Sequence, residues 1–333
     1  YKVTPRFTPS HRNLSMRHLA LPAVLALTLA APAATLAAPN VVATFLPVHA
    51  IVFAIMAGVG TPALLIDTPV SPHTYALTPS KRQLLQDADL VIGIGPDMEA
   101  GIWEVIEAMQ GRHLELSETV ADRLIGSAED DDEHEAEPQR EDEAGHRLHL
   151  LHDPHIWLDT GIAAELADAV AARLSELDPA NVGTYRANAA KFAVTLQIVN
   201  AEIATGLVGQ PDRIAVNYHD AFGYFARQWH IRVDFVVPEP DMAPSVGKVA
   251  ELRQHARAGE IACLMTEPQF QPDLLVELAD DYGLRILEID PEGALIAPGP
   301  DAYLTLMRRI GATFAACLDP RGNPPLAAAV RFN

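Results

Sequence analysis

Basic residues are scarce in this sequence. Among its 333 residues, 24 are Lys or Arg and 44 are Asp or Glu, which gives a formal net charge of −20. A protein that binds nucleic acid through its phosphates needs a basic face, so the composition argues against such a partner. A negative field attracts cations instead. The charge balance therefore favours a positively charged ligand.

Cysteine is also nearly absent, since only Cys263 and Cys317 occur. Neither has a second thiol nearby in the sequence, which argues against a thiolate metal site. In an oxidising compartment one distant pair favours a structural disulfide, and two buried free thiols are the alternative. A disulfide that closes a loop of this length should stabilise the fold by about 4 kcal/mol.

Long apolar runs are absent except near the beginning of the sequence. Residues 19–38 hold no charge, are dominated by Ala and Leu, and follow a basic stretch, which is typical of a secretory signal peptide. We expect cleavage near Ala37 or Ala38, and we expect residues 1–15, which precede Met16, to carry no fold. A membrane-spanning helix is the weaker alternative, because two prolines interrupt the run and no later segment is long and apolar enough to cross a bilayer.

Beyond this leader, short β-like runs alternate with helical ones. One series lies between residues 41 and 94, and a second begins near Ile214 and continues to Ile289. Such alternation predicts βα units with parallel sheets, and hence an α/β protein with two lobes. Residues 181–207 have few helix breakers and carry apolar positions at helical spacing, so we expect one linking helix there. Two helices joined by a short turn are the alternative.

One segment of the first lobe, residues 127–151, differs from its surroundings. It holds ten acids between residues 129 and 143 and is too polar to build a core, so we expect a disordered or mobile insertion. It is either solvated surface or a loose collector of metal ions. The histidines that would collect metal are His134, His146 and His149 in this segment and His152 directly after it. The expected divisions of the chain are a leader at 1–38, an N-terminal lobe at 39–177, a linking helix at 178–207 and a C-terminal lobe at 208–333.

Four short motifs place a His or an Asp in a turn. They are Ser71-Pro-His-Thr-Tyr, Asp153-Pro-His-Ile-Trp-Leu-Asp, Asn217-Tyr-His-Asp-Ala-Phe-Gly-Tyr-Phe and Glu288-Ile-Asp-Pro-Glu-Gly. His219 and Asp290 directly follow predicted strands. Ligand sites of open α/β sheets lie at the carboxyl ends of strands, so these turns can converge on one cleft, with two motifs from each lobe.

The motifs together offer three imidazoles, from His73, His155 and His219, and one carboxylate, from Asp290. This set suits a tetrahedral Zn²⁺ ion, whereas Mn²⁺ favours more oxygen ligands. Taken singly, each of these histidines has an ordinary structural alternative as a helix cap, a core hydrogen-bonder or a surface residue. Residues expected to contact the ligands rather than the metal are His49, Asp220 and Glu267.

In this order, the four motifs resemble the metal-binding solute receptors of ABC transporters, most closely the zinc-specific ZnuA type. The similarity extends to Thr78-Pro-Ser, to Gly95-Pro-Asp-Met-Glu and to Thr266-Glu-Pro-Gln-Phe. The resemblance implies two (β/α)₄ lobes joined by one long backbone helix, with zinc held between them. It also implies a disulfide between Cys263 and Cys317.

For function, the resemblance implies a periplasmic protein that binds Zn²⁺ with high affinity and delivers it to the membrane permease of an ABC importer. We expect a monomer without enzymatic activity. The implied ligands are His73, His155 and His219. The fourth position is open between Asp290, an acid of the insertion such as Glu133, and water.

The sequence departs from the family pattern in two places. The insertion is rich in acids and comparatively poor in histidine, which weakens its interpretation as a zinc reservoir. The second motif continues Leu158-Asp-Thr where Leu-Asp-Pro is usual, a change that we expect to affect a helix start more than the metal.

Three other functions compete with the zinc receptor. A manganese or iron receptor would share the architecture. A secreted zinc hydrolase would also use three histidines with an open water position, but the sequence has no His-Glu-x-x-His motif and no obvious general base beyond Glu267 and Asp220. An adhesin on the same scaffold is neither supported nor excluded by the sequence.

Overall fold

The computed structural model describes residues 1–4, 8, 37–126, 152–270 and 273–320. The chain divides into two compact units, residues 1–37 and 38–333, and the second holds every helix and strand of the described residues. The expected leader falls mostly outside the described residues. Within the described ranges, no helix combines the length and the apolar character needed to traverse a bilayer.

The first sheet has four parallel strands in the order β2-β1-β3-β4. Its elements are β1 (Val41–Ala43), α1 (Leu46–Met56), β2 (Ala63–Leu64), α2 (Pro79–Gln86), β3 (Leu90–Gly93), α3 (Ala100–Glu107) and β4 (His113–Glu115). Strands β1 and β3 are buried throughout, which explains why they read as continuous apolar runs rather than as alternating ones.

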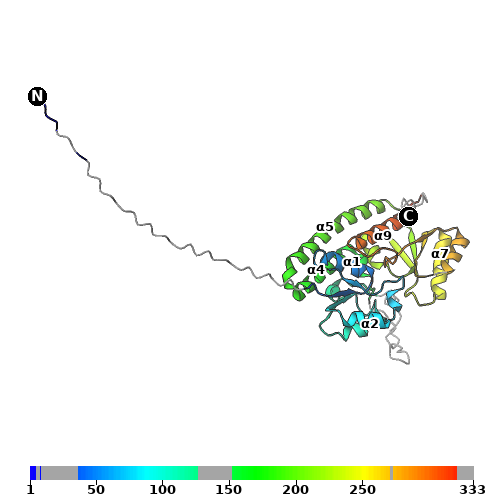
Figure 1. Ribbon diagram of the computed structural model, residues 1–333. Coiled ribbons are helices and arrows are strands. Elements are labelled where there is room, and N and C mark those ends of the chain that lie inside the picture. The colour runs from blue at the N-terminus through cyan, green and yellow to red at the C-terminus, as the bar shows by residue number, and fades with distance from the viewer. Residues whose placement is uncertain (5–7, 9–36, 127–151, 271–272, 321–333) are drawn as a thin grey trace. The chain divides into compact units, whose positions relative to one another are not determined.

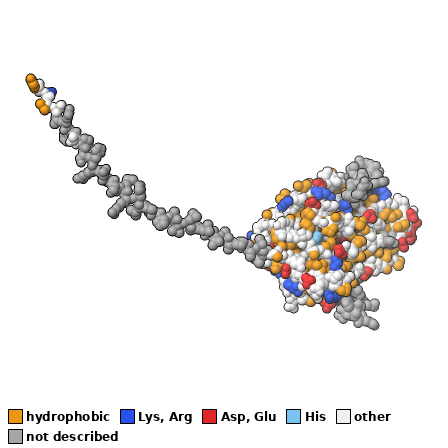
Figure 2. Space-filling view, in the orientation of Figure 1, with side chains coloured by type: hydrophobic (Ala, Val, Ile, Leu, Met, Phe, Trp, Pro, Cys, Tyr) orange, Lys and Arg blue, Asp and Glu red, His pale blue; other side chains and the backbone are white. Residues whose placement is uncertain are grey.

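The second sheet repeats this arrangement in the order β6-β5-β7-β8, again with parallel pairs only. Its elements are β5 (Ile214–His219), α6 (Gly223–Trp229), β6 (Arg232–Val237), α7 (Val246–Ala258), β7 (Ile261–Thr266), α8 (Asp273–Tyr282) and β8 (Ile286–Glu288). The prediction of an α/β protein with two parallel sheets is therefore confirmed. In Figure 2, acidic side chains gather at the right edge of the molecule, in the region of α7 and α8, and α8 itself carries four acids.

Long helices connect the first sheet to the second along the chain. Helix α5 (Val182–Leu207) is continuous, as expected, and contacts α4 (Thr160–Leu177), α1 and α9 (Ala302–Leu318) (Figure 1). Its buried positions recur every three or four residues, which gives it one apolar face. These positions are Tyr185, Ala189, Phe192, Leu196, Val199 and Ile203.

Thr160, where the family usually has proline, begins helix α4. Asp159 caps this helix by accepting hydrogen bonds from the amides of residues 161 and 162, so the helix start does not need the proline. The amide that a proline would lack donates to Gln228 Oε1 of α6 at 3.1 Å. The Thr160 hydroxyl also donates to Asn200 Oδ1 of α5 at 2.7 Å. The departure therefore adds contacts between the two halves while keeping the helix start.

Cys263 of β7 and Cys317 of α9 form a disulfide, which confirms the expected pairing. Both residues are buried, and 54 positions separate them in the sequence. The bond fixes the C-terminal helix to a central strand of the second sheet.

Replacing both cysteines by alanine should lower the free energy of unfolding by about 4 kcal/mol, because the unfolded chain regains the entropy of an open loop. Denaturant titration of the oxidised protein and the Cys263→Ala/Cys317→Ala variant measures the difference. The reduced wild-type protein is the control and should behave like the variant. A loss under about 1 kcal/mol would show that the bond contributes little.

Candidate metal centre

His73 lies in a short 3₁₀ turn, η1 (Pro72–Thr74), on the loop after β2. Pro72 occupies the first position of this turn, where its fixed φ favours helical geometry. Helix α3 packs closely against the turn at Gly101, where an added Cβ would lie 2.5 Å from the Tyr75 carbonyl oxygen. Only glycine fits there. Gly101 therefore helps to fix the position of η1, although it is far from His73 in the sequence.

His155 directly precedes the turn η4 (Ile156–Leu158) and is 2 % exposed. Asp153 Oδ1 contacts both the His155 amide at 2.9 Å and His155 Nδ1 at 2.8 Å. Burial raises the pKa of Asp153 to about 7. Its ionised form only accepts hydrogen bonds, so in that form Nδ1 carries the proton and Nε2 keeps its lone pair free for a metal.

His219 ends strand β5 and is 1 % exposed. Its Nδ1 lies 2.7 Å from Oε1 of Glu267, which directly follows β7. Strands β5 and β7 are neighbours at the position where the strand order reverses, and ligand sites of open α/β sheets gather there. The topology therefore brings His219 and its carboxylate partner together although 48 residues separate them.

The three rings meet at one place. One ligand atom of each histidine lies within 4.8 Å of the others. The Nε2 atoms of His155 and His219 are 3.3 Å apart, and His73 Nε2 is buried without a hydrogen-bond partner in the described residues. A tetrahedral ion with Zn–N distances of about 2.0 to 2.1 Å separates its nitrogens by about 3.3 Å. The arrangement suits a metal ion of that size.

Burial controls the charge of these imidazoles. It lowers the pKa of His73 and of His155 well below the usual range, and the neighbouring imidazoles lower both further. Burial also disfavours charge on His219, but the carboxylate of Glu267 outweighs it and raises the pKa of His219. Two of the rings are therefore held neutral and ready for metal, and the third must release its proton first when it is charged.

Asp290 follows β8 and shapes the loop that it begins. Its Oδ1 accepts hydrogen bonds from the amides of Glu292 at 3.1 Å and Gly293 at 2.8 Å. Gln269 Nε2 donates to the same oxygen at 3.3 Å. Among the described residues, the group whose ligand atoms lie within 4.8 Å contains the three histidines and not Asp290.

Glu292 is a member of this loop that the sequence analysis did not single out. It is 5 % exposed, and burial together with the charges of Glu267 and Asp290 raises its pKa well above the usual range. Its Oε2 accepts a hydrogen bond from Gln269 Nε2 at 3.2 Å. The signal was present in Glu288-Ile-Asp-Pro-Glu-Gly, where Glu292 stands two residues after Asp290.

The other expected site residues that the structure describes do not belong to the group of three histidines. His49 Nε2 lies 3.1 Å from the Pro62 carbonyl oxygen, and its ring packs against Phe53, so its described contacts belong to the first lobe. The carboxyl of Asp220 lies near His219, and burial and the charge of Asp153 raise its pKa to about 7. His134, His146 and His149 lie outside the described residues.

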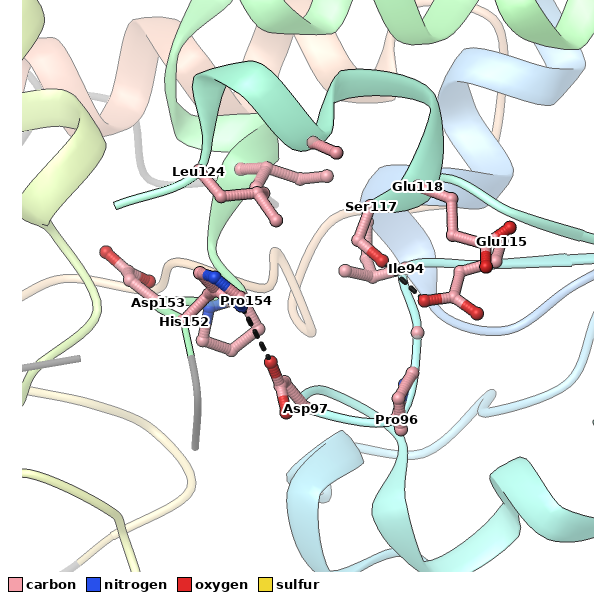
Figure 3. A pocket seen from close by; sticks show the side chains of 13 residues that line it. Ile94, Pro96, Asp97, Glu115, Ser117, Glu118, Leu124, His152, Asp153 and Pro154 are labelled. Carbon is pink, nitrogen blue, oxygen red and sulfur yellow. Dashed lines mark hydrogen bonds and ion pairs between the residues drawn. The ribbon is translucent and has the colours of Figure 1, made fainter. Parts of the chain in front are cut away.

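His152 borders a pocket of about 240 Å³ beside the histidines (Figure 3). Its Nδ1 lies 3.8 Å from Asp97 Oδ2, and Figure 3 shows these two side chains facing each other. Asp153 also lines the pocket and contacts His155, so the pocket adjoins the metal centre.

A second group in the described residues, Asp234, Glu251 and His255, also has ligand atoms within 4.8 Å of one another. The ammonium group of Lys248 already neutralises these carboxylates, because its Nζ is 2.5 Å from Asp234 and 3.2 Å from Glu251. This group is therefore an ion-pair network on the surface.

Known proteins resemble this chain over most of its length. The family model described as "Zinc-uptake complex component A periplasmic" matches residues 41–317. The high-affinity zinc uptake system protein ZnuA of Yersinia pestis is 30% identical over 318 residues, which cover 92% of this chain and 99% of that protein.

Two solved structures show the same fold. The periplasmic zinc binding protein TroA from Treponema pallidum superimposes with a TM-score of 0.70 at 21% identity and covers 84% of this chain and 99% of its own. A mutant of the laminin-binding adhesin Lmb from Streptococcus agalactiae gives a TM-score of 0.71 at 19% identity and covers 84% of this chain and 100% of its own. At these identities the likeness concerns the fold alone.

Changing Asp153 to Asn should weaken the binding of a divalent metal ion about 10- to 100-fold, because an amide no longer holds the His155 ring as an ionised carboxylate does. Competition titration against a chelator measures the change. Asp168→Asn, at an exposed position of α4, is the matched control and should bind as the wild type does. Equal affinity of the two variants would contradict a role for Asp153 in orienting the ring.

Proposed function

Because the chain belongs to the family of periplasmic A components of zinc-uptake complexes, we propose that it binds Zn²⁺ between its two lobes and delivers the ion to the membrane permease of an ABC importer. The observation that carries the proposal is the convergence of His73, His155 and His219, with His155 and His219 Nε2 atoms 3.3 Å apart. A tetrahedral zinc ion needs this spacing of nitrogens.

We propose His73, His155 and His219 as the protein ligands, with Asp290 as the fourth. The charge of Asp290 acts on buried Glu292, and Gln269 links the two side chains, which supports a place for Asp290 beside the centre. Its Oδ1 accepts two backbone amides and its Oδ2 accepts the amide of Leu295 at 3.4 Å, so metal binding would shift the loop or replace the longest of these bonds. Water and an acid of residues 127–151 such as Glu133 are the alternatives.

Two features favour a zinc receptor over the competing functions. Three imidazoles favour zinc over manganese, which prefers oxygen ligands. Of the two candidate general bases, Glu267 lies against His219 Nδ1, where it orients a ligand, so it is not placed to activate water for a zinc hydrolase. Asp220, whose carboxyl is near His219, is the remaining candidate for that alternative. The adhesin alternative rests on a likeness of fold only. The proposed protein is a carrier without a bond-breaking step.

The remaining parts of the proposal concern location and domain organisation. The family description names a periplasmic component, and residues 19–38 have the pattern of a cleaved leader, so we place the protein in the periplasm. We propose that it acts as a monomer with lobes at 39–177 and 208–333, joined by residues 178–207.

Alanine at His73, His155 or His219 should reduce bound zinc from one ion per chain to a small fraction, because each change removes one of the few ligands. Metal analysis after dialysis against a weak chelator measures the content. His255→Ala is the control, since it disrupts only the surface network around Lys248. Full zinc content in the His219→Ala variant, or loss in His255→Ala, would contradict the assignment.

Zinc affinity should fall as the pH falls. The pKa of His219 is raised by Glu267, so below that pKa the ring must release a proton for each ion bound, and affinity drops about tenfold per pH unit. His73 and His155 have lowered pKa values and add to the loss only in more acidic solution. The Glu267→Gln variant lacks the charge that raises the pKa of His219, so its zinc affinity should begin to fall at a lower pH. Unchanged wild-type affinity between about pH 7.5 and about pH 5 would contradict metal binding through imidazole.

A further inference from the structure

Trp157 occupies the junction between the two halves of the metal centre. It lies in η4 two residues after His155, it is fully buried, and its ring centroid is 5.2 Å from that of His155. On its other side the ring meets Phe45, which follows β1, edge to face at 4.9 Å. The indole is therefore held by the first lobe and contacts a metal ligand of that lobe.

The indole N–H reaches into the second lobe. Nε1 donates to the Pro291 carbonyl oxygen at 2.9 Å, across 134 positions of sequence. Pro291 directly follows Asp290. The Trp157 carbonyl accepts a second bond from the Tyr303 hydroxyl of α9 at 2.6 Å. One residue thus contacts His155 and also bonds to the loop that begins with Asp290.

That loop has little freedom of its own. Asp290 Oδ1 fixes the amides of residues 292 and 293, as described above. Gly293 has φ +70°, and an added Cβ would lie 2.9 Å from Leu46 Cδ2 of α1. Because the loop is stiff and close-packed, a bond at Pro291 fixes the position of the neighbouring Asp290 as well.

We propose that Trp157 is a positioning residue that sets His155 and the Asp290 loop in one geometry, so that ligands from both lobes reach the ion together. The inference rests on the proposed zinc function and extends it to a residue that does not touch the metal. The indole N–H supplies the hydrogen bond to Pro291, whereas the aromatic rings supply packing. A phenylalanine at this position keeps most of the packing and removes that hydrogen bond.

The test compares zinc affinity of Trp157→Phe, Asp290→Asn and the double variant by chelator competition. Trp157→Phe should bind about tenfold more weakly, the range seen when a partner that orients a ligand is lost. If Trp157 acts through the loop, the double variant should lose less than the product of the single losses. Trp103→Phe, which removes a buried indole elsewhere in the first lobe, is the control and should bind as the wild type does.

Several outcomes would overturn the inference. Wild-type affinity in Trp157→Phe, even with a lower melting temperature, would show that the residue is structural only. Fully multiplicative losses would exclude action through the loop.

A fluorescence measurement tests the same coupling without any change at Trp157. In the Trp103→Phe/Trp229→Phe protein, saturating zinc should alter the emission of the remaining tryptophan, and constant emission would contradict the coupling. If this protein and the wild type bind no zinc at all, the proposed function fails instead.

Discussion

The structure depends on keeping three imidazoles close together in a buried place, with those of His73 and His155 held uncharged. Three rings within 4.8 Å would repel one another if protonated, and burial lowers the pKa of His73 and His155 enough to prevent this. Carboxylates at Nδ1 of His155 and His219 then direct the opposite nitrogens to one point. A divalent ion, as proposed above, would bind the lone pairs that otherwise face one another.

The scaffold explains how residues so distant in sequence reach that point. His219 and Glu267 follow adjacent strands of the second sheet, whereas His73 and His155 come from turns of the first lobe. Helix α5 lies against helices of both halves and is continuous, so large hinge motions would break much packing. The hydrogen bonds of Thr160 with Gln228 and of Trp157 with Pro291 oppose such motions as well. For the proposed metal capture, we therefore expect small movements of the loops rather than a large hinge motion.

Much of this was predictable from the sequence because the patterns are local. Buried parallel strands read as apolar runs, the α5 face repeats every three or four residues, and each histidine stands in a turn motif. The role of Glu267 was expected only in outline, since its pairing with His219 depends on strand order. Glu292 was missed although its motif was recognised, because its burial beside Glu267 and Asp290 arises only in the folded loop. Trp157 was missed because its bond to Pro291 crosses from one lobe to the other. A single sequence does not show such contacts.

The most direct test of the central claim is X-ray absorption at the zinc edge of the protein loaded with one equivalent of zinc. The account predicts a first shell of nitrogen and oxygen with about three imidazoles at about 2.0 to 2.1 Å, and loss of one imidazole signal in the His73→Ala variant. A shell with one imidazole or none, or one that is unchanged by that substitution, would show that the three rings do not share the ion.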